Sequence, residues 1–364
     1  MKKLYLSAFF IAPLLLAAQR SVDLDKYNFT VHYRSLPQFK LDSTYRTYHV
    51  QVEGTKMMEP FLQDLSPENS VMLEGWKKLS QDGHIGIRVK LGDLLPESFS
   101  VKERTESVKN ISGVITGTRT YYHQEVVYSF AATASIEDYK GMHIMDQELA
   151  SRQNKQVYNS PEFAIKPVAE GYFLVNSLAV TKDLYQRAVN RAMHYLSERI
   201  SDNFGFREVF SNDYMWIIDS RKHPEYKAWR EMFSRMSEVL FNMDANTPIE
   251  GVREQMKPVI SYFEKIRTLY PSSKRHDRKI RYASYFNLAV LYYYLDDPQS
   301  MMKEANGLVL NDYDSRDGKG FEETAVWLKN LFQQSNIYTR HFPVNTTDYR
   351  GPNEKTDATS GSRE

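Results

Sequence analysis

The sequence contains no cysteine, and this absence excludes several kinds of chemistry. Without a thiol the chain can form no disulfide, use no cysteine nucleophile and bind no zinc ion through sulfur. It also has no cysteine to which a lipid anchor could be attached. The stability of the fold must therefore come from the burial of a core, for which 364 residues are ample.

The chain also lacks an excess of either charge. Its 47 Lys and Arg residues nearly balance its 46 Asp and Glu residues, so the formal net charge is +1. A nucleic-acid partner normally leaves a basic surface, and we therefore expect none. The mean hydropathy of -0.56 and the lack of a second long apolar run predict no membrane span in the mature chain.

The one long apolar run lies at the start of the chain. Lys2 and Lys3 precede a mostly apolar stretch over 4–18, which ends in two alanines and is followed by polar residues. This order is typical of a secretory signal peptide, and roughly fifteen residues are too few to cross a bilayer. We predict a signal peptide over 1–19 and a mature protein that is soluble in the periplasm, or held at the outer membrane only through a partner. A retained anchor or a buried first helix is the alternative.

The region 20–222 is predicted to be a β-rich α+β domain. Apolar and polar residues alternate over 48–53 and 84–91, as in strands with one covered face. Four further strands are predicted from runs of β-branched and aromatic residues, over 114–122, 125–136, 172–175 and 214–219. The residues from Asp138 to Gly141 are predicted to form a turn.

One helix is predicted inside this domain, over 181–203. Apolar residues recur every four positions from Leu184 to Ile200 and form the stripe of an amphipathic helix. Thr181 is a suitable N-cap, and Gly205 lies just beyond the predicted end.

From 223 to 343 the pattern predicts an all-α domain. Apolar stripes at helical spacing predict helices over 229–240, 249–270, 280–295, from 298 onward and over 322–333. Thr247 and Glu250 form a capping box with proline at N1 between them. Pro258 is predicted to kink or split its helix. The tail over 344–364 has almost no apolar residues and is predicted to be disordered.

The helix around residue 288 resembles the first helix of a tetratricopeptide repeat. That family places a bulky aromatic residue, a leucine, a small residue and a tyrosine at fixed positions, here filled by Tyr285, Leu288, Ala289 and Tyr292. We predict that these four residues form the seam between neighbouring helices. The resemblance covers roughly 225–335, and the second helix departs from the pattern, with Met301 where alanine is usual. Such repeats imply protein binding on a concave helical surface, and an irregular bundle is the alternative.

A second, looser resemblance concerns the whole chain. A signal peptide, a β-rich first half and a degenerate helical repeat together are similar to exported proteins of Bacteroidota envelopes. This resemblance implies a place in a cell-envelope assembly, but a fold does not by itself give a function.

No catalytic motif withstands inspection. Ser300 and Lys303 match the Ser-x-x-Lys motif of penicillin-binding enzymes, and 201–203 reads Ser-Asp-Asn, but the two stand in the wrong order and no Lys-Thr-Gly follows. A nucleophile elbow, a Walker loop, a dinucleotide fingerprint and a His-Glu-x-x-His motif are all absent from the sequence. We therefore predict no catalytic residue and no cofactor.

The best metal candidate is an acidic loop near residue 312. Counting Asp312 as position 1 of a calcium loop places Asp314 at position 3 and Glu323 at position 12. However, Arg316 then stands where an oxygen ligand is needed, and Asp317 stands where glycine is needed. The alternative is a solvated turn between two helices.

These patterns predict a non-enzymatic periplasmic scaffold, in which an α+β domain binds an envelope component and a TPR-like helical domain binds a second protein. The partner would be another envelope protein. The alternative is an envelope glycan-binding protein or hydrolase with its site in the β-rich domain, to which aromatic pairs such as Tyr121 and Tyr122 could contribute. A calcium-dependent adhesion module is a third hypothesis.

Overall fold

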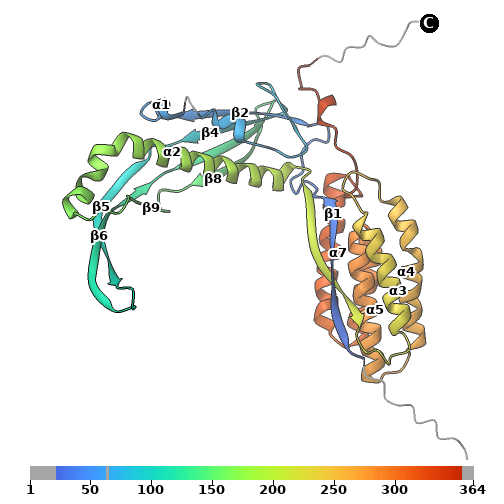
Figure 1. Cartoon of the computed structure of the whole chain (residues 1–364). Coiled ribbons are helices and arrows are strands. Elements are labelled where there is room, and N and C mark those ends of the chain that lie inside the picture. The colour runs from blue at the N-terminus through green and yellow to red at the C-terminus, as the bar shows by residue number, and fades with distance from the viewer. Residues whose placement is uncertain (1–21, 63–64, 355–364) are drawn as a thin grey trace, which may run out of the picture. The chain divides into compact units, whose positions relative to one another are not determined.

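A computed structural model of the chain describes residues 22–62 and 65–354 (Figure 1). The predicted order is confirmed: a β-rich region over 24–159 is followed by a mostly helical region. The chain folds into two compact units. Unit 1 contains the residues up to Arg34 together with Glu208–Phe342, and unit 2 contains Ser35–Arg207 together with the residues from Pro343 onward. The predicted signal peptide lies outside the described residues.

Unit 1 is a series of helices covered by a two-stranded sheet. Its helices are α3 (Tyr226–Phe241), α4 (Glu250–Leu269), α5 (Arg275–Tyr294), α6 (Pro298–Asn311) and α7 (Ser315–Ser335), and each packs on the next along the chain. The strands β1 (Leu24–Arg34) and β10 (Glu208–Ile218) pair in antiparallel register over their whole length, from Leu24 opposite Ile218 to Arg34 opposite Glu208.

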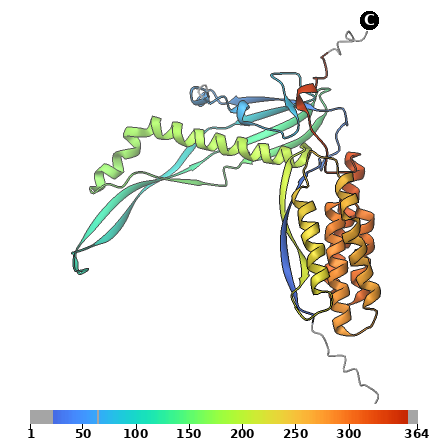
Figure 2. The same ribbon diagram turned by 45° about the vertical axis from the view of Figure 1, so that its right-hand side comes forward.

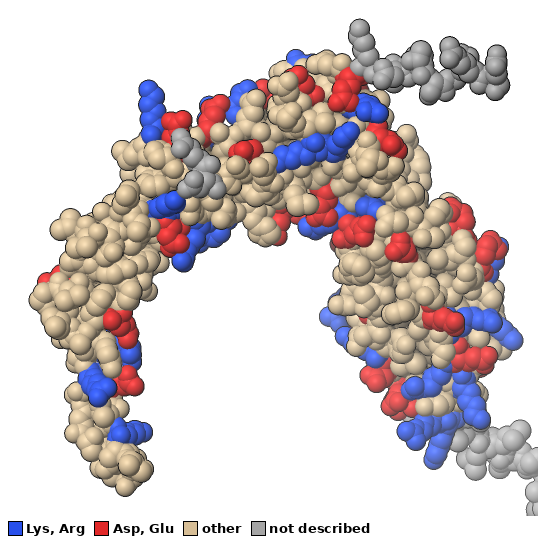
Figure 3. Space-filling view, turned by 45° about the horizontal axis from the view of Figure 1, so that its top comes forward, with Lys and Arg blue, Asp and Glu red and all other residues tan. Residues whose placement is uncertain are grey.

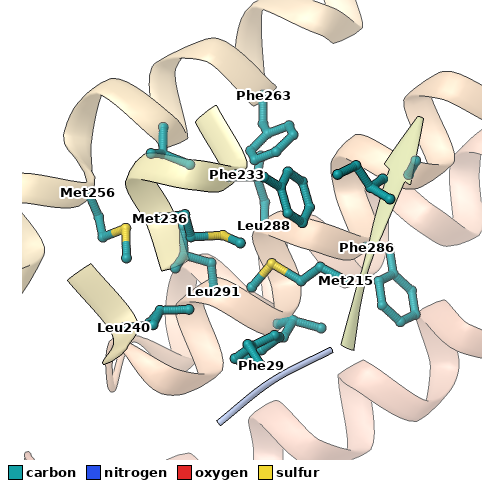
Figure 4. Close-up of a cluster of buried hydrophobic side chains, with 14 of the residues drawn as sticks. Phe29, Met215, Phe233, Met236, Leu240, Met256, Phe263, Phe286, Leu288 and Leu291 are labelled. Carbon is teal, nitrogen blue, oxygen red and sulfur yellow. The ribbon is translucent and has the colours of Figure 1, made fainter. Parts of the chain in front are cut away.

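The core of unit 1 lies between this β-ribbon and the helices (Figure 4). The predicted stripes supply it: Phe233 and Met236 of α3, Phe263 of α4 and Leu288 of α5 are all fully buried. Met215 of β10 points into the same cluster. Apolar side chains spaced at a helical period therefore do assemble into one hydrophobic core.

The compact units are divided differently from the predicted domains. The predicted boundary near 222 placed both β1 and β10 in the β-rich domain, whereas both strands belong to the helical unit. The physical reason is burial, because Phe29 and Val31 of β1 face the helical core. The pairing of two strands so far apart in sequence leaves no local signal.

The structure shows neither the predicted capping box nor a split of α4 at Pro258. The helix is continuous through Pro258 and is not split. Pro258 is exposed, so the Glu254 carbonyl that loses its helical N–H donor can face water instead. Thr247 makes no capping box, because α4 begins at Glu250 without a side-chain cap hydrogen bond.

Unit 2 is built on a mixed five-stranded sheet in the order β3-β2-β4-β7-β8. Its strands are β2 (Thr47–Gly54), β3 (Lys77–Lys78), β4 (Ile85–Leu91), β7 (Ala132–Asp138) and β8 (His143–Ala150). The strand β2 runs parallel to β3 and β4, and the remaining pairs are antiparallel. Short helical turns, α1 (Glu59–Leu62) and η1 (Pro67–Ser70), connect β2 to β3. The predicted turn after β7 is confirmed, since the Gly141 N–H bonds to the Asp138 carbonyl at 2.9 Å.

A second sheet and one long helix complete unit 2. The sheet has the order β5-β6-β9, formed by β5 (Leu95–Lys109), β6 (Ile115–Ser129) and β9 (Gln156–Asn159). Helix α2 (Lys166–Phe204) is 39 residues long. It packs along the strands of this unit and ends at Gly205, as predicted (Figures 1 and 2).

Three predictions for this region are wrong. The stretch 172–175 is not a strand but lies inside α2, which begins at Lys166 rather than at Thr181. The predicted strand 125–136 is two strands, since β6 ends at Ser129 and β7 begins at Ala132. The long strand β5 was not predicted, because its outer half is polar on both faces and shows no apolar alternation.

The first part of the predicted disordered tail is ordered. Residues 346–348 form a 3-10 turn, η2 (Thr346–Asp348). The Lys77 ammonium donates hydrogen bonds to the carbonyls of Thr347 at 3.3 Å and Tyr349 at 2.9 Å. Backbone carbonyls held by a lysine fix this segment even though it has few apolar side chains. Residues 355–364 lie outside the described part of the chain.

Candidate protein-interaction surfaces

The four predicted repeat residues lie on α5 and contact the neighbouring helices. Leu288 is buried in the main core of unit 1, and Ala289 is buried against Met301 of α6 and Ala325 of α7. Tyr292 is partly buried and packs against both the main core and the small cluster around Ala289. The Tyr285 ring lies over Gly307 of α6, where an added Cβ atom would clash with it. These contacts explain the spacing physically, because a small residue is needed wherever two helices approach closely.

The turn between the two helices follows the sequence signals. Asp297 caps α6 by accepting a hydrogen bond from the Ser300 N–H at 2.9 Å, and Pro298 occupies the first turn of the helix. Both features are favourable at a helix N-terminus.

The three residues of the predicted calcium loop are not brought together. Asp312 ends α6 and binds the guanidinium of Arg278 at 3.3 Å, while Asp314 caps α7 and pairs with Arg316. Glu323 is exposed two turns further along α7. Among residues 22–62 and 65–354, no group of three or more His, Asp or Glu side chains is placed to hold a metal ion. The two aspartates instead act as helix caps and arginine partners.

A cavity in unit 2 does not offer paired carboxylates. It has a volume of about 230 Å³ and lies between α2 and the β8–β9 connection. Its polar lining consists of Arg191, Asn154, Gln156, Ser151 and Tyr195, with no Asp or Glu. Glycoside hydrolysis typically needs two carboxylic acids facing each other, and this cavity lacks them.

A buried ion pair holds the last segment of unit 1. Arg340 donates from Nε to Asp296 Oδ1 at 2.6 Å, and its backbone N–H donates to Asp296 Oδ2 at 2.6 Å. Its guanidinium also lies 4.3 Å from the ring of Tyr33 and 4.4 Å from that of Tyr293. Only 1% of Arg340 is exposed. A pair so deeply buried is inaccessible to a ligand, and we assign it a structural role.

His341, next in sequence, makes unit 1 sensitive to acid. Burial lowers the pKa of its imidazole, and only 2% of the residue is exposed. The folded state therefore keeps His341 neutral, whereas the unfolded chain takes up a proton near pH 6.5. Because the unfolded state then binds more protons, stability is lost as the pH falls below this value.

We expect His341→Gln to flatten this acid dependence. The free energy of unfolding would be measured by urea denaturation between pH 7.5 and pH 5. His194→Gln, at an exposed position of α2, serves as the control and should leave the slope unchanged. An unchanged pH slope in the His341 variant would contradict the assignment.

A groove lies on unit 1 between the start of α6 and the second half of α7. It has a volume of about 640 Å³, and its floor and walls are mainly apolar. Its lining includes Met302, Val326, Phe332 and Tyr338, with Lys329 and Asp297 as the charged side chains nearest its edge. Apolar grooves of this size are suited to receive a helix or an extended peptide.

An exposed apolar surface of unit 2 lies on the outward face of α2 in its first third. Leu174 and Val175 are each 83% exposed, and Leu178 is 72% exposed. At 100° per residue these three side chains share one face of the helix with Val168, Gly171 and Ala179, and none of the six is charged. We call this surface the α2 apolar face. It extends over about 18 Å from Pro167 to Ala179.

The opposite side of the same segment is apolar as well. Ala169 and Val180 are buried, and the Phe173 ring packs at 5.1 Å from the ring of Phe99 on β5. A helix that is apolar all round is normally covered on all sides. Exposed aliphatic side chains in such a cluster mark an interaction surface.

Sequence reasoning missed this face for a specific reason. The segment Tyr172-Phe173-Leu174-Val175 has neither a helical period nor charged residues, so its β-branched and aromatic residues predicted a strand. The only usable signal was the absence of charge between Glu170 and Lys182.

Comparison with known proteins adds no relative: no protein-family model matches the chain, and no curated protein matches it. Within the described residues, no helix combines the length and apolar character needed to cross a membrane.

Proposed function

We propose that this protein is an exported adaptor of the cell envelope that binds a partner protein through the α2 apolar face. The observation that carries the proposal is the exposure of Leu174, Val175 and Leu178 on an uncharged helical face. Such a face is costly to leave in water, because burial of each large aliphatic side chain is worth about 1.5–3 kcal/mol.

The chemistry of the face also defines the kind of partner. With no charged side chain over several turns, it offers nothing to an ionic ligand. The partner surface should be equally apolar and uncharged, such as the stripe of an amphipathic helix. The groove on unit 1, lined by Met302 and Phe332, would be the second attachment point that a scaffold requires.

The tetratricopeptide-like packing around Ala289 supports the same function. Ala289 and Tyr292 pack against Met301 of α6 and Ala325 of α7, which is compatible with the predicted seam between repeat helices. Repeat ancestry and the cell-envelope location remain predictions from sequence, and they are part of this proposal.

We expect Leu174→Glu with Leu178→Glu to abolish partner binding without unfolding unit 2. The complex would bury both leucines, so replacing them should weaken binding roughly hundredfold or more. A photo-crosslinking amino acid at Val175, in the native envelope, should give a discrete adduct that disappears in the double variant.

The matched control places the same charges at the same spacing on the same helix. Asn190→Glu with His194→Glu changes two exposed polar positions of α2, four residues apart like Leu174 and Leu178. This control should retain the adduct. Equal adduct yields in the two double variants would refute the α2 apolar face as the binding surface.

A further inference from the structure

Within the described residues, the outer half of the β5–β6 hairpin is exposed, and Arg104 ties it to Glu162 outside the hairpin. From Lys102 to Arg119 every residue except Val108 is exposed. Figures 1 and 2 both show this part of the hairpin extending beyond the rest of unit 2. An isolated two-stranded ribbon is only marginally stable in water, and a third strand is normally needed.

The strand β5 has one free edge along its entire length. In the order β5-β6-β9 it is an outer strand, and it pairs only with β6, from Leu95 opposite Ser129 to Lys109 opposite Ile115. Alternate backbone N–H and C=O groups of its 15 residues therefore point away from the sheet. Between the irregularities at Pro96 and Lys109, the unpaired edge of β5 is a template for another strand.

The charged side chains of β5 determine which kind of strand can pair with its free edge. Positive and negative charges follow one another closely along it, in the order Lys102, Glu103, Arg104, Glu106 and Lys109. In Figure 3 the narrow arm of unit 2 carries both basic and acidic side chains, while its end carries none. A strand with mixed charges selects a partner with the reverse pattern.

We propose that β5 pairs with the β5 strand of a second copy of this chain, antiparallel about a two-fold axis at Thr105. This register places Arg104 of each copy opposite Glu106 of the other, so that opposite charges meet twice. Each neighbouring register is worse. With the axis at Arg104 two arginines meet, and with the axis at Glu106 two glutamates meet.

The remaining contacts of this register are also compatible. Lys102 lies opposite Val108, and Glu103 lies opposite Ser107, so no like charges face each other. The hairpin turn with the fully exposed Ile111 comes beside Phe99 of the second copy, which is half exposed in a single chain. The result is a continuous four-stranded sheet, β6-β5-β5-β6, across the axis.

Arg104 already has acidic partners within its own chain. Arg104 donates from Nε and Nη2 to the two carboxylate oxygens of Glu162, both at 2.8 Å. Its Nη1 is directed toward Glu106 of its own strand at 3.4 Å. Its guanidinium also lies 5.1 Å from the Tyr121 ring of β6, so pairing with the Glu106 of a second copy would replace its contact to the Glu106 of its own strand.

Cysteine crosslinking tests the axis directly, because the chain has no cysteine of its own. Thr105→Cys places two thiols opposite each other across the axis, within reach of a disulfide. Ser107→Cys, on the same face, places its two thiols about 14 Å apart. We expect a covalent dimer from the first variant under mild oxidation and none from the second. Equal crosslinking of both variants, or crosslinking of neither, would overturn the proposed register.

Charge exchange tests the ion pairs. Glu106→Arg alone and Arg104→Glu alone each bring like charges together twice, and each should weaken the dimer roughly tenfold as measured by sedimentation. A mixture of the two variants restores opposite charges at both positions and should form a heterodimer. A wild-type chain that sediments as a monomer, or a mixture no more dimeric than its components, would refute the proposal.

The dimer is separate from partner binding at the α2 apolar face. Leu174→Glu with Leu178→Glu leaves β5 unchanged and should sediment as the wild type does. Loss of the dimer in that variant would instead show that α2, and not β5, joins the two copies.

Discussion

Asp296→Asn should destabilise unit 1 by about 3–5 kcal/mol, because it leaves the Arg340 guanidinium buried without its counter-ion. The Arg340 side chain cannot escape to water, since it is 1% exposed and held between the rings of Tyr33 and Tyr293. Burial lowers the pKa of the guanidinium and Asp296 is the main neighbour that raises it, but an arginine remains protonated in proteins even without such a partner. Asparagine tolerates the positive φ of 56° at this position, so backbone strain does not contribute to the loss.

The double variant separates charge from packing. Arg340→Met removes the cation and keeps an apolar stem of similar length, so the combination with Asp296→Asn buries no charge. We expect the double variant to be more stable than the sum of the two single losses predicts. Strict additivity of the two losses would argue against a coupled pair.

The measurement is urea denaturation followed by tryptophan fluorescence. Three of the four tryptophans, Trp216, Trp229 and Trp327, lie in unit 1, so the signal reports mainly this unit. Glu254→Gln breaks an exposed ion pair with Lys257 on α4 and should cost less than about 1 kcal/mol. An Asp296 variant as stable as this control would disprove the structural role of the buried pair.

The helices of unit 1 were predictable because their sequence carries a local signal. Phe233, Met236 and Leu240 mark one face of α3, and Asp297 with Pro298 marks the start of α6. Burial of a stripe and capping of an end depend on residues within a few positions of each other. A single sequence is sufficient to read such signals.

The parts that were missed depend on contacts between distant residues or on the absence of a core. The pairing of β1 with β10 joins residues more than 170 positions apart, from Leu24 with Ile218 to Arg34 with Glu208. The strand β5 is held by hairpin pairing with β6 rather than by burial. In both cases the strand is stabilised by pairing with another strand, and the local pattern of side chains does not predict that pairing.

The candidate surfaces were missed for the same reason. The seam residues Leu288 and Ala289 were predicted, because a seam has a fixed spacing. An interaction surface is defined instead by what the fold leaves uncovered, as at Leu174 and Val175. Exposure of a residue is a property of the folded chain, so only the structure reveals it.

The second large loss of stability is expected at Asn287. Its side chain forms hydrogen bonds with the edge of β10, where a neighbouring strand would otherwise pair. Its Oδ1 accepts a hydrogen bond from the Trp216 N–H at 2.7 Å, and its Nδ2 donates to the Trp216 carbonyl at 2.8 Å. The same carbonyl accepts a second bond from the Trp229 indole N–H at 3.0 Å. Asn287 is fully buried, so water cannot take its place.

We expect Asn287→Leu to cost about 1–3 kcal/mol, because the Trp216 N–H is left without a partner while the carbonyl keeps its bond to Trp229. Asn287→Asp should cost more at pH 7. A carboxylate can accept from the N–H, but it places a buried negative charge against the Trp216 carbonyl oxygen. The aspartate variant should therefore lose more stability than the leucine variant, because its carboxylate is buried against the Trp216 carbonyl oxygen.

The two variants should also differ in their response to pH. Burial would raise the pKa of the introduced carboxyl above the value of about 3.9 that it has in the unfolded chain. The aspartate variant therefore regains stability relative to wild type as the pH falls toward that value, because the protonated acid can again donate a hydrogen bond to the Trp216 carbonyl. Relative to wild type, the leucine variant has no such dependence.

Asn330→Asp, at an exposed position of α7, should change stability by less than about 0.5 kcal/mol. An aspartate variant at position 287 that behaves like this control would show that the β10 edge needs no partner from α5.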